Sequence, residues 1–398
     1  MIKGNDRLTY AGLLSRVEYL SAVLQEHGLK KGDKIVLWAG VSIEWVCAYF
    51  GIIHAGGVAV LLNPSLAAKD AAPLVQFADT AMVLYGQTHD TKGETEEAAG
   101  LAEAFGMRQE QLICLTAVDW DDRDAVPPVC RSMDGDASAD AYVIYTSGTT
   151  AFPKAVMNSQ LGMINLCAGL EKAIGDRKGQ RVMLAVPLCH VYGLNGLWLY
   201  LSTGGTVVFP EVIKAADVAQ AAAVHQAAAL WSVAVIYQGI ADSEELTAML
   251  SSRIRLCTIA GSYTTPLQFM RYEAALRKAV FLNCYGMTET SGAYCLTRPG
   301  DSVKVRYHTV GRAMPGMELA IWDAQRGMLP SGEIGEIVTR GFHMKNSYYK
   351  LENEKQGCDA GGWFHSGDLG TLDEDGNLTI VGRCKDIIIK GGENIAPS

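Results

Sequence analysis

The stretch KIVLWAGVSIEWVCAYFGIIHAGGVAVLL, residues 34–62, decides the fold class. It opens with the apolar run Lys34–Trp38 and closes with the apolar run Val58–Leu62, and both have the length of a buried strand. Between them, Ser42–His54 is long enough for a helix, and Gly56-Gly57 break the chain after it. A strand, a helix and a strand joined by short links predict a parallel sheet with crossover helices.

The same alternation continues on both sides of this stretch. Apolar residues from Leu13 to Leu24 recur at helical spacing and predict a helix that stops near Gly28. The Ala-rich stretch Ala215–Ala229 predicts a solvent-facing helix ahead of a buried strand at Trp231–Ile236. Further strands are predicted at Met82–Tyr85, Leu112–Leu115 and Ala141–Tyr145.

The sequence changes in character beyond Thr309. Glycine recurs there, and the apolar runs become short and alternate with polar residues, which predicts a small, mostly β subdomain that begins at about Val310. The strands expected in it are Glu318–Trp322, Gly335–Thr339, Leu378–Val381 and Ile387–Ile389.

Composition excludes several classes of protein. The chain has 398 residues, of which 49% are hydrophobic and 19% charged, so it has material for a large core and is not disordered as a whole. Its formal net charge of −9 argues against a surface that binds duplex nucleic acid, which needs clustered cations. The most membrane-like stretch, Trp45–Leu62, contains His54 and Gly56-Gly57, so a helix, a turn and a buried strand explain it better than a membrane span.

The ten cysteines are scattered and form no C-x-x-C pair, and no basic, apolar leader opens the chain. We therefore expect reduced thiols in a cytoplasmic protein rather than a disulfide framework.

The loop YTSGTTAFPK, residues 145–154, carries the strongest chemical signal. A small-residue loop after a strand can wrap its backbone N–H groups around phosphates, and its hydroxyls add donors. Lys154 would add a compact positive charge. The loop is not a Walker motif, because no second glycine precedes the lysine, and taken alone it could be an ordinary Ser/Thr/Gly turn.

Four further segments follow this loop in order. They are PLCHVYG at 187–193, YGMTE at 285–289, WFHSGDL at 363–369, and GRCKD at 382–386 together with GENI at 392–395. With these motifs, from about Leu8 to Ile395, the chain resembles the adenylate-forming superfamily of acyl- and aryl-CoA ligases, luciferase-like enzymes and peptide-synthetase adenylation domains.

The resemblance implies an α/β fold in which two parallel-sheet subdomains flanked by helices are followed by a smaller β subdomain. We expect the two α/β subdomains with the ATP and acid sites in residues 1–309, the small β-rich subdomain in 310–386, and a hinge in 387–398. The implied reaction joins a carboxylate to the α-phosphate of ATP, giving acyl-AMP and pyrophosphate, and then passes the acyl group to the thiol of coenzyme A. The protein's part in such chemistry is positioning and charge stabilisation.

The resemblance also assigns roles to individual residues. The β- and γ-phosphates would be held by Thr146, Ser147, Gly148, Thr149, Thr150 and Lys154. In the YGMTE motif, Thr288 would hydrogen-bond the α-phosphate and Glu289 would hold Mg²⁺. Tyr285 would pack beside the adenine, and Gly286 and Met287 would also lie at the nucleotide. Asp368 would accept both ribose hydroxyls, Arg383 would donate near them, His190 would orient the acid's carboxylate, and Gly261 and Ser262 would lie on the adenine side.

Two departures from the family pattern stand in the phosphate loop. Ala151 and Ala155 occupy positions where the family usually has glycine. If either position needs a positive φ, its Cβ costs about 1 kcal/mol. The adenine-side segment Ala260–Leu267 also departs from the usual small-residue form.

The substrate class follows from the acid-binding segment. His190-Val191-Tyr192-Gly193 offers no carboxylate to an α-ammonium, so we expect an aliphatic or aromatic acid rather than an α-amino acid. Three alternatives stay open: an enzyme that loads a carrier protein instead of coenzyme A, a nucleotide-binding paralogue with little catalysis, and, more remotely, a luciferase-like oxygenase.

The chain stops at Ser398, just past the hinge motif, whereas the family continues into a lid domain that carries a catalytic lysine. We therefore expect these 398 residues to bind ATP and acid but to adenylate poorly. The expected partners are a small carboxylic acid and, through an edge strand or helix, a second copy of the chain.

Overall fold

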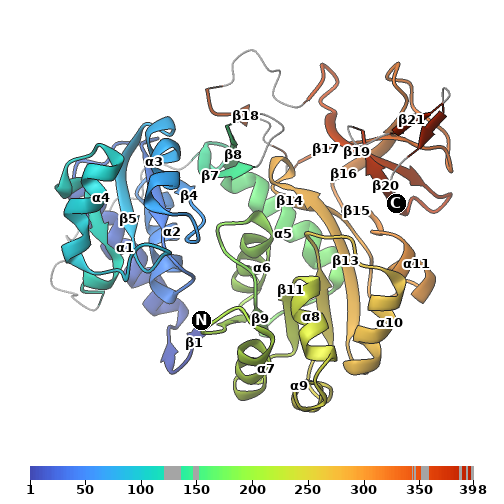
Figure 1. Cartoon of the computed structure of the whole chain (residues 1–398), viewed down its shortest axis with the longest axis horizontal. Helices are drawn as coiled ribbons and strands as arrows, with labels where there is room; N and C mark the ends of the chain where they lie inside the picture. Colours follow the sequence, from blue (N-terminus) through green and yellow to red (C-terminus); the bar gives the residue numbers. More distant parts are fainter. Residues whose placement is uncertain are drawn as a thin grey trace. The chain divides into compact units, whose positions relative to one another are not determined.

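The computed structural model describes residues 1–120, 136–146, 152–342, 344, 347–350, 358–384, 388–390 and 393–395 (Figure 1). The chain forms two compact units. The first consists of Met1–Leu161 with Pro187–His190, and the second consists of Gly162–Val186 with Val191–Ser398.

The first unit is built on a sheet in the order β8-β7-β4-β3-β5-β6, parallel throughout except for the antiparallel β7–β8 pair. These strands are β3 (Lys34–Trp38), β4 (Val58–Leu61), β5 (Thr80–Tyr85), β6 (Leu112–Cys114), β7 (Asp140–Thr146) and β8 (Lys154–Ser159). The helices are α1 (Tyr10–Glu26), α2 (Ile43–His54), α3 (Ala68–Phe77) and α4 (Ala98–Phe105). Short elements complete the unit: β1 (Ile2–Lys3), β2 (Asp6–Arg7), η1 (Thr95–Glu97), η2 (Gln109–Gln111) and η3 (Leu115–Ala117).

The strand–helix–strand prediction for residues 34–62 is confirmed. β3 begins at Lys34 and ends at Trp38, as predicted, and β4 follows α2 after a turn at Gly56, where φ is +84°. The predicted helix start at Ser42 has a local cause: the hydroxyl of Ser42 accepts a hydrogen bond from the Trp45 amide at 3.0 Å and caps α2. In the described part of the chain, no helix is both long and apolar enough to cross a membrane.

The second unit contains a sheet in the order β15-β14-β13-β12-β11-β9-β10. Pairing is parallel from β10 to β13 and antiparallel from β13 to β15. The strands are β9 (Arg181–Leu184), β10 (Thr206–Phe209), β11 (Ala229–Ser232), β12 (Leu256–Ile259), β13 (Val280–Met287), β14 (Gly292–Leu296) and β15 (Arg312–Ala313).

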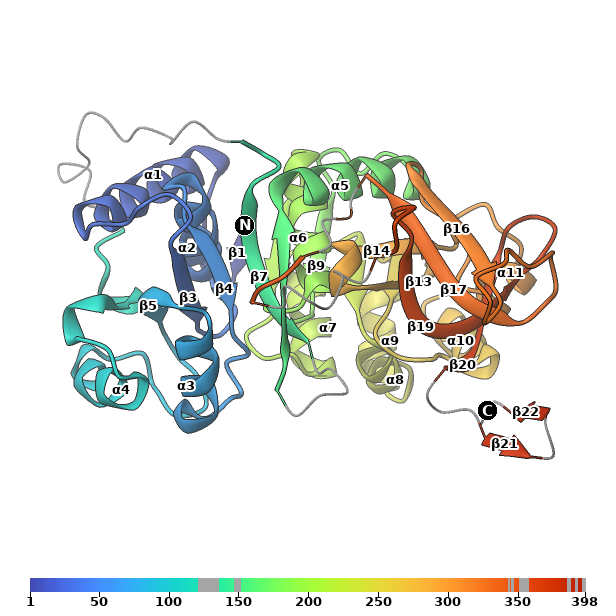
Figure 2. The ribbon, with the colours of Figure 1, turned by 90° about the horizontal axis from the view of Figure 1, so that it is seen from above.

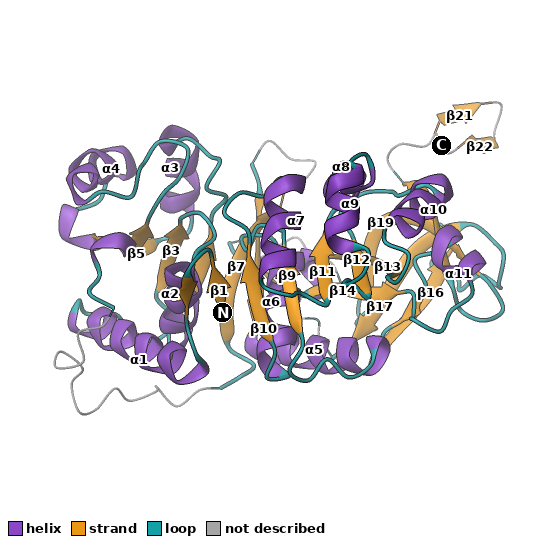
Figure 3. Ribbon diagram, turned by 90° about the horizontal axis from the view of Figure 1, so that it is seen from below, coloured by secondary structure: helices purple, strands orange, loops and turns teal. Residues whose placement is uncertain are grey.

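Helices flank this sheet, with α5 on one face and α7 and α8 on the other (Figures 2 and 3). They are α5 (Gln160–Ile174), α6 (Val191–Ser202), α7 (Ala215–Val224), α8 (Ala234–Ala241), α9 (Glu244–Leu250), α10 (Pro266–Ala275) and α11 (Val303–His308), with η4 (Thr288–Thr290) after β13.

The prediction of one buried strand over Trp231–Ile236 is wrong. The strand β11 ends at Ser232, and after Val233 the chain enters α8, in which Ile236 is a buried helical residue. The physical reason is that a short, continuous apolar run has no periodicity with which to separate a buried strand from a buried helix turn.

A four-stranded antiparallel sheet follows in the order β16-β17-β19-β20, formed by Met317–Trp322, Gly335–Gly341, Phe364–Leu372 and Leu378–Arg383. The remaining short strands are β18 (Ser347–Tyr348), β21 (Ile388–Lys390) and β22 (Glu393–Ile395). The predicted α/β class, with parallel sheets flanked by helices and a smaller antiparallel sheet, is confirmed.

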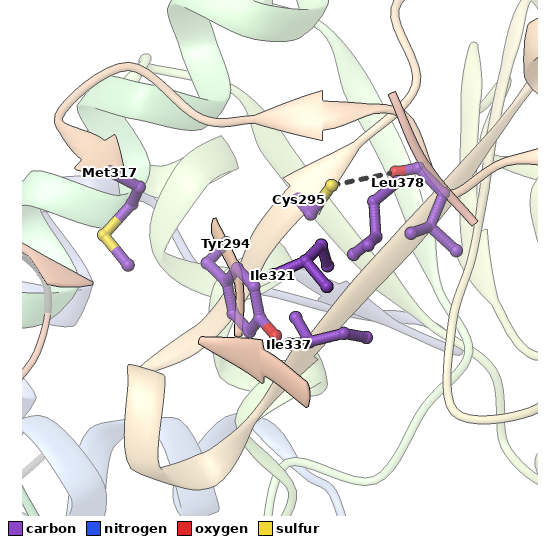
Figure 4. Packing of buried hydrophobic residues seen from close by; sticks show 7 residues of the cluster. Tyr294, Cys295, Met317, Ile321, Ile337 and Leu378 are labelled. Carbon is purple, nitrogen blue, oxygen red and sulfur yellow. Dashed lines mark hydrogen bonds between the residues drawn. The ribbon is translucent and has the colours of Figure 1, made fainter. Parts of the chain in front are cut away.

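One apolar cluster joins the small sheet to β14 (Figure 4). Ile321 of β16 and Ile337 of β17 pack with Tyr294 and Cys295 of β14, and the Cys295 thiol donates to the Val310 carbonyl at 3.4 Å. Tyr285 of β13 packs against the same cluster. This packing fixes the position of the small sheet relative to β13, and the candidate site depends on it.

Candidate active site

Three of the expected residues meet through their side chains. The Tyr285 hydroxyl donates to Oδ2 of Asp368 at 2.5 Å, and Nε of Arg383 lies 3.3 Å from Oδ1 of the same carboxylate. Asp368 is largely buried, with 14% of its side chain exposed, whereas 73% of the Arg383 side chain is exposed. The result is one carboxylate at the small sheet, with a phenol at one oxygen and an exposed guanidinium at the other.

Strand pairing explains why these residues meet. Asp368 of β19 lies directly opposite Arg383 of β20. Gly367, the residue before Asp368, has a φ of +72°, a conformation that favours glycine, and its carbonyl accepts from the Cys384 amide at 2.9 Å. The turn therefore aims the Asp368 side chain toward β13, where Tyr285 receives it.

The environment of Tyr285 keeps its hydroxyl protonated. Burial raises its pKa well above the usual value, and the neighbouring Asp368 carboxylate raises it further. Tyr294, whose ring packs edge-on against Tyr285 at 5.1 Å between centroids, has its pKa raised first by burial as well. Tyr285 therefore stays protonated at neutral pH and donates to Asp368.

The remainder of the YGMTE motif forms a tight turn between β13 and β14. Thr288 and Glu289 lie in η4, and Oε1 of Glu289 accepts from the Tyr348 hydroxyl at 3.0 Å. The buried Thr290 hydroxyl closes the turn by donating to the Gly292 carbonyl at 2.6 Å.

Asn195 of α6 holds this turn from beneath. Its side chain is fully buried, its amide donates to the Ser291 carbonyl at 2.9 Å, and its oxygen accepts from the Ala293 amide at 3.2 Å. A Cβ on Gly292, where φ is +126°, would stand 2.0 Å from the Asn195 oxygen, so the close packing of Asn195 against this turn requires glycine at position 292.

Replacing Asn195 by leucine is expected to lower the free energy of unfolding by about 2–4 kcal/mol, because two buried backbone groups lose their partner. Urea unfolding followed by tryptophan fluorescence measures the loss. Asn165→Ala is the matched control, because Asn165 makes one exposed bond, to the Phe342 carbonyl, and should cost less than about 1 kcal/mol. Equal stabilities of the two variants would contradict the role assigned to Asn195.

The expected adenine-side residues follow a neighbouring strand. Gly261 and Ser262 are exposed and follow β12 after Ala260, with a φ of +85° at Gly261. Since β9, β11, β12 and the first half of β13 are parallel, their carboxyl ends lie at one edge of the sheet, which is where ligands bind in open α/β sheets. Tyr285 lies beyond the parallel part of β13, at this same edge.

His190 and the phosphate loop belong to the first unit. His190 is solvent-accessible, yet protein atoms displace part of the water around its ring, which lowers its pKa, so the neutral form predominates at pH 7. Thr146 ends β7 and pairs with Lys154, which begins β8. The expected phosphate-binding residues Ser147, Gly148, Thr149 and Thr150, and with them Ala151, lie outside the described residues.

Ala155 does not carry the strain that a positive φ would impose. It is a buried residue of β8, paired with Tyr145, and its φ is not positive. The conditional cost of its Cβ therefore does not arise, because an extended strand accepts alanine.

Glu289 could bind a magnesium ion only together with oxygen ligands from a bound nucleotide and from water. Mg²⁺ prefers carboxylate, phosphate and water oxygens, and Glu289 offers a second oxygen beside the one that Tyr348 bonds. Within the ranges the structure describes, no group of three or more His, Cys, Asp or Glu could hold a metal. Phosphate oxygens and water would therefore supply most of the ligands.

A cavity of about 310 Å³ lies in the first unit, and none of the expected site residues lines it. Its walls come from α1, β5, α4 and β6 and include Val23, Tyr85, Ala98 and Cys114.

Sequence reasoning missed three residues that support the site: Asn195, Tyr348 and Glu336. Nothing in the spacing of Asn195 indicates which turn it holds. Tyr348 and Glu336 are 59 and 31 residues away in the chain from the groups that they bond, Glu289 and Gly367. The only available signal was that Glu336 falls in a predicted strand of the small sheet.

Three comparisons relate the chain to known proteins. Residues 1–349 match the family model described as AMP-binding enzyme. The chain is 26% identical to the long-chain-fatty-acid–CoA ligase FadD13 of Mycobacterium tuberculosis, over 98% of this chain and 76% of that protein. It is 27% identical to the 2-succinylbenzoate–CoA ligase of Bacillus velezensis, over 100% of this chain and 77% of that protein. Among solved structures, ATP-bound MatB from Rhodopseudomonas palustris superposes with a TM-score of 0.84 at 26% identity, covering 98% of this chain and 76% of that one.

Proposed function

The chain belongs to the family of AMP-binding enzymes, and from this premise we propose that it is an AMP-forming acid–CoA ligase. It would activate a carboxylic acid with ATP to acyl-AMP and then transfer the acyl group to coenzyme A. The observation that carries the proposal is the Tyr285–Asp368–Arg383 cluster, a single ionised acceptor with fixed orientation. Two of the relatives named above are CoA ligases, which supports the choice of acceptor thiol.

The proposed roles follow from the chemistry of each group. Asp368 accepts hydrogen bonds from the two ribose hydroxyls, since an ionised carboxylate has two acceptor oxygens. Thr288 donates to the α-phosphate, and Lys154 with the loop from Thr146 to Thr150 holds the outer phosphates. A magnesium ion on Glu289 and phosphate oxygens would supply positive charge to the triphosphate. Gly261, Ser262, Gly286 and Met287 line the adenine side.

The acid is proposed to be aliphatic or aromatic. Tyr192 follows His190 in the chain, and its hydroxyl bonds the Thr258 hydroxyl at 2.8 Å and the Ser232 carbonyl at 3.2 Å, so this segment presents a ring and no free carboxylate. An α-amino acid would bring an ammonium group that has no partner in this segment, and burying that charge unpaired is costly. Neutral His190 could donate one hydrogen bond to the acid's carboxylate and orient it.

A panel of non-hydrolysable acyl-adenylate analogues with different acyl groups tests the proposal. Ligand that binds only the native state stabilises it by about 2.7 kcal/mol at a hundredfold excess over Kd, so the melting temperature should rise with one acyl class. Analogues of α-amino acyl adenylates should give a much smaller rise. No rise with any analogue or with Mg-ATP would contradict the proposed function.

Lys154→Ala should weaken the binding of the outer phosphates of ATP without weakening the binding of the adenylate part. We expect its ATP affinity to fall about tenfold or more, because a charged hydrogen bond is lost, while its affinity for an acyl-adenylate analogue, which lacks those phosphates, stays close to that of the wild type. Lys178→Ala, at an exposed loop position, is the matched control and should change neither. An equal loss for both ligands would show that Lys154 does not act on the outer phosphates.

We also propose a division into residues 1–309, 310–386 and 387–398, a cytoplasmic location and a homodimer. The expectation that these 398 residues adenylate poorly also stays a prediction, and near-normal turnover by this chain would refute it.

A further inference from the structure

The turn that carries Asp368 is supported from outside the site already described. In the pairing of β17 with β19, Glu336 lies opposite Leu369 and Val338 lies opposite His365. The three residues Ser366, Gly367 and Asp368 therefore face the single residue Ile337, so this part of β19 bulges out of the ladder. Backbone groups in a bulge lose their strand partners and need others.

Glu336 supplies the missing partner. Its Oε1 accepts from the Gly367 amide at 3.1 Å, and its Oε2 lies 2.8 Å from Nδ1 of His365. The Glu336 side chain is 27% exposed and that of His365 is 22% exposed, so both contacts are shielded from bulk water. One carboxylate thus bridges the residue before the bulge and the residue at its centre.

His365 is in turn held on its other sides. Its Nε2 lies 3.8 Å from Oδ2 of Asp359, and its ring packs edge-on against Trp322 at 5.5 Å between centroids. Asp359 is itself fixed, because its Oδ1 accepts from the amides of Gly361 and Trp363 at 2.8 and 3.0 Å. The brace formed by Glu336, His365 and Asp359 is therefore anchored on the backbone of Gly361 and Trp363.

We propose that Glu336, braced by His365, is a positioning residue: it fixes the Gly367 amide and thereby the direction in which Asp368 meets the ribose hydroxyls. The inference rests on the proposed function, because Asp368 is the ribose acceptor only there. Tyr285 and Arg383 hold the carboxylate at its oxygens, whereas Glu336 holds the backbone that carries it. Loss of Glu336 leaves the carboxylate and its contacts with Tyr285 and Arg383 in place but removes the side-chain acceptor of the Gly367 amide.

The test compares the binding of ATP, 2′-deoxy-ATP and 3′-deoxy-ATP by isothermal titration calorimetry. In the wild type, each missing hydroxyl costs affinity, and the affinity ratio of ATP to either deoxy analogue measures how well Asp368 is aimed. E336A is expected to lower that ratio about tenfold, and E336Q, whose amide oxygen can still accept from Gly367, should keep most of it. In a D368A background, E336A should change the ratio little further, because the two residues act through one contact.

Glu318→Ala is the matched control. Glu318 lies on β16 of the same sheet and pairs at the surface with Arg340, so the ratio should not change. If E336A does not fold, H365L is measured instead. Its affinity ratio of ATP to the deoxy analogues is expected to fall about threefold, because Glu336 keeps its bond to Gly367 but loses its contact with His365.

The failures of the two proposals can be told apart. If D368A leaves the ratio of ATP to deoxy-ATP at its wild-type value, the ribose role of Asp368 is wrong and the proposed function loses its main support. If D368A lowers the ratio but the folded Glu336 or His365 variant does not, Asp368 reads the ribose without help and the positioning role is overturned.

Discussion

Replacing Asp368 by alanine is expected to remove nearly all of the stabilisation that an acyl-adenylate analogue gives the protein. Two hydrogen bonds between ribose hydroxyls and a carboxylate are lost, each worth about 1.5–3 kcal/mol, so Kd should rise about a hundredfold or more. At an analogue concentration a hundred times the wild-type Kd, the stabilisation should fall from about 2.7 to about 0.4 kcal/mol.

The comparison must be made within each variant, because Asp368 also supports the fold. Without the carboxylate, the buried Tyr285 hydroxyl loses its acceptor, which should itself cost about 1–3 kcal/mol in the absence of ligand. Each melting temperature with ligand is therefore compared with that of the same variant alone. Asp375→Ala, in the exposed turn between β19 and β20, is the control and should keep the full shift. A full shift in the Asp368 variant would remove the ribose acceptor from the proposed function.

Replacing Gly286 by alanine should disrupt the site from the backbone. A Cβ at this position would stand 2.0 Å from the Gly292 carbonyl oxygen and 2.5 Å from the Ala293 Cα. Both are backbone atoms of the partner strand β14, so neither can rotate away as a side chain would. The strands must separate where their register already shifts, beside Tyr285.

We expect the free energy of unfolding to fall by more than about 4 kcal/mol, which places this substitution among the exceptional ones. Urea unfolding measures it, and nucleotide binding should be lost together with stability because Tyr285 moves with the strand. Gly300→Ala is the control: a Cβ there meets nothing within 4 Å, so the change should stay within about 0.5 kcal/mol. A Gly286 variant as stable as the Gly300 variant would show that the hairpin can open without cost.

The parts of the fold that the sequence predicted well are those in which a local pattern is sufficient. The capping residue of α2, the apolar spacing of β3 and α2 and the turn glycines all agree, and the predicted bounds differ from the observed ones by one residue at most. The run Trp231–Ile236 lacked such agreement, because its residues suit a strand and a helix equally. In the structure β11 ends at Ser232, and Val233 is the N-cap of α8.

The candidate site divides in the same way. The WFHSGDL and YGMTE motifs indicated Asp368 and Tyr285, and the structure brings their side chains together. The motifs could not indicate Glu336, because its partner Gly367 depends on how a bulge in β19 faces β17. Contacts of this kind depend on tertiary register, which a single sequence without homologues does not contain.

The buried thiols of this chain have a practical consequence. Burial raises the pKa of Cys47, Cys189 and Cys284 to about 12 each, and it raises the pKa of Cys167 and Cys295 as well. All nine cysteines of the described ranges are free. Because only the thiolate reacts with alkylating reagents, these side chains are not alkylated until the surrounding structure unfolds.

These thiols are divided between the two units, with Cys47 and Cys189 in the first and Cys167, Cys284 and Cys295 in the second. A short pulse of iodoacetamide at successive times during denaturation, followed by peptide mass spectrometry, would show when the thiols of each unit become reactive. The native sequence thus carries its own labels for following the unfolding of each unit.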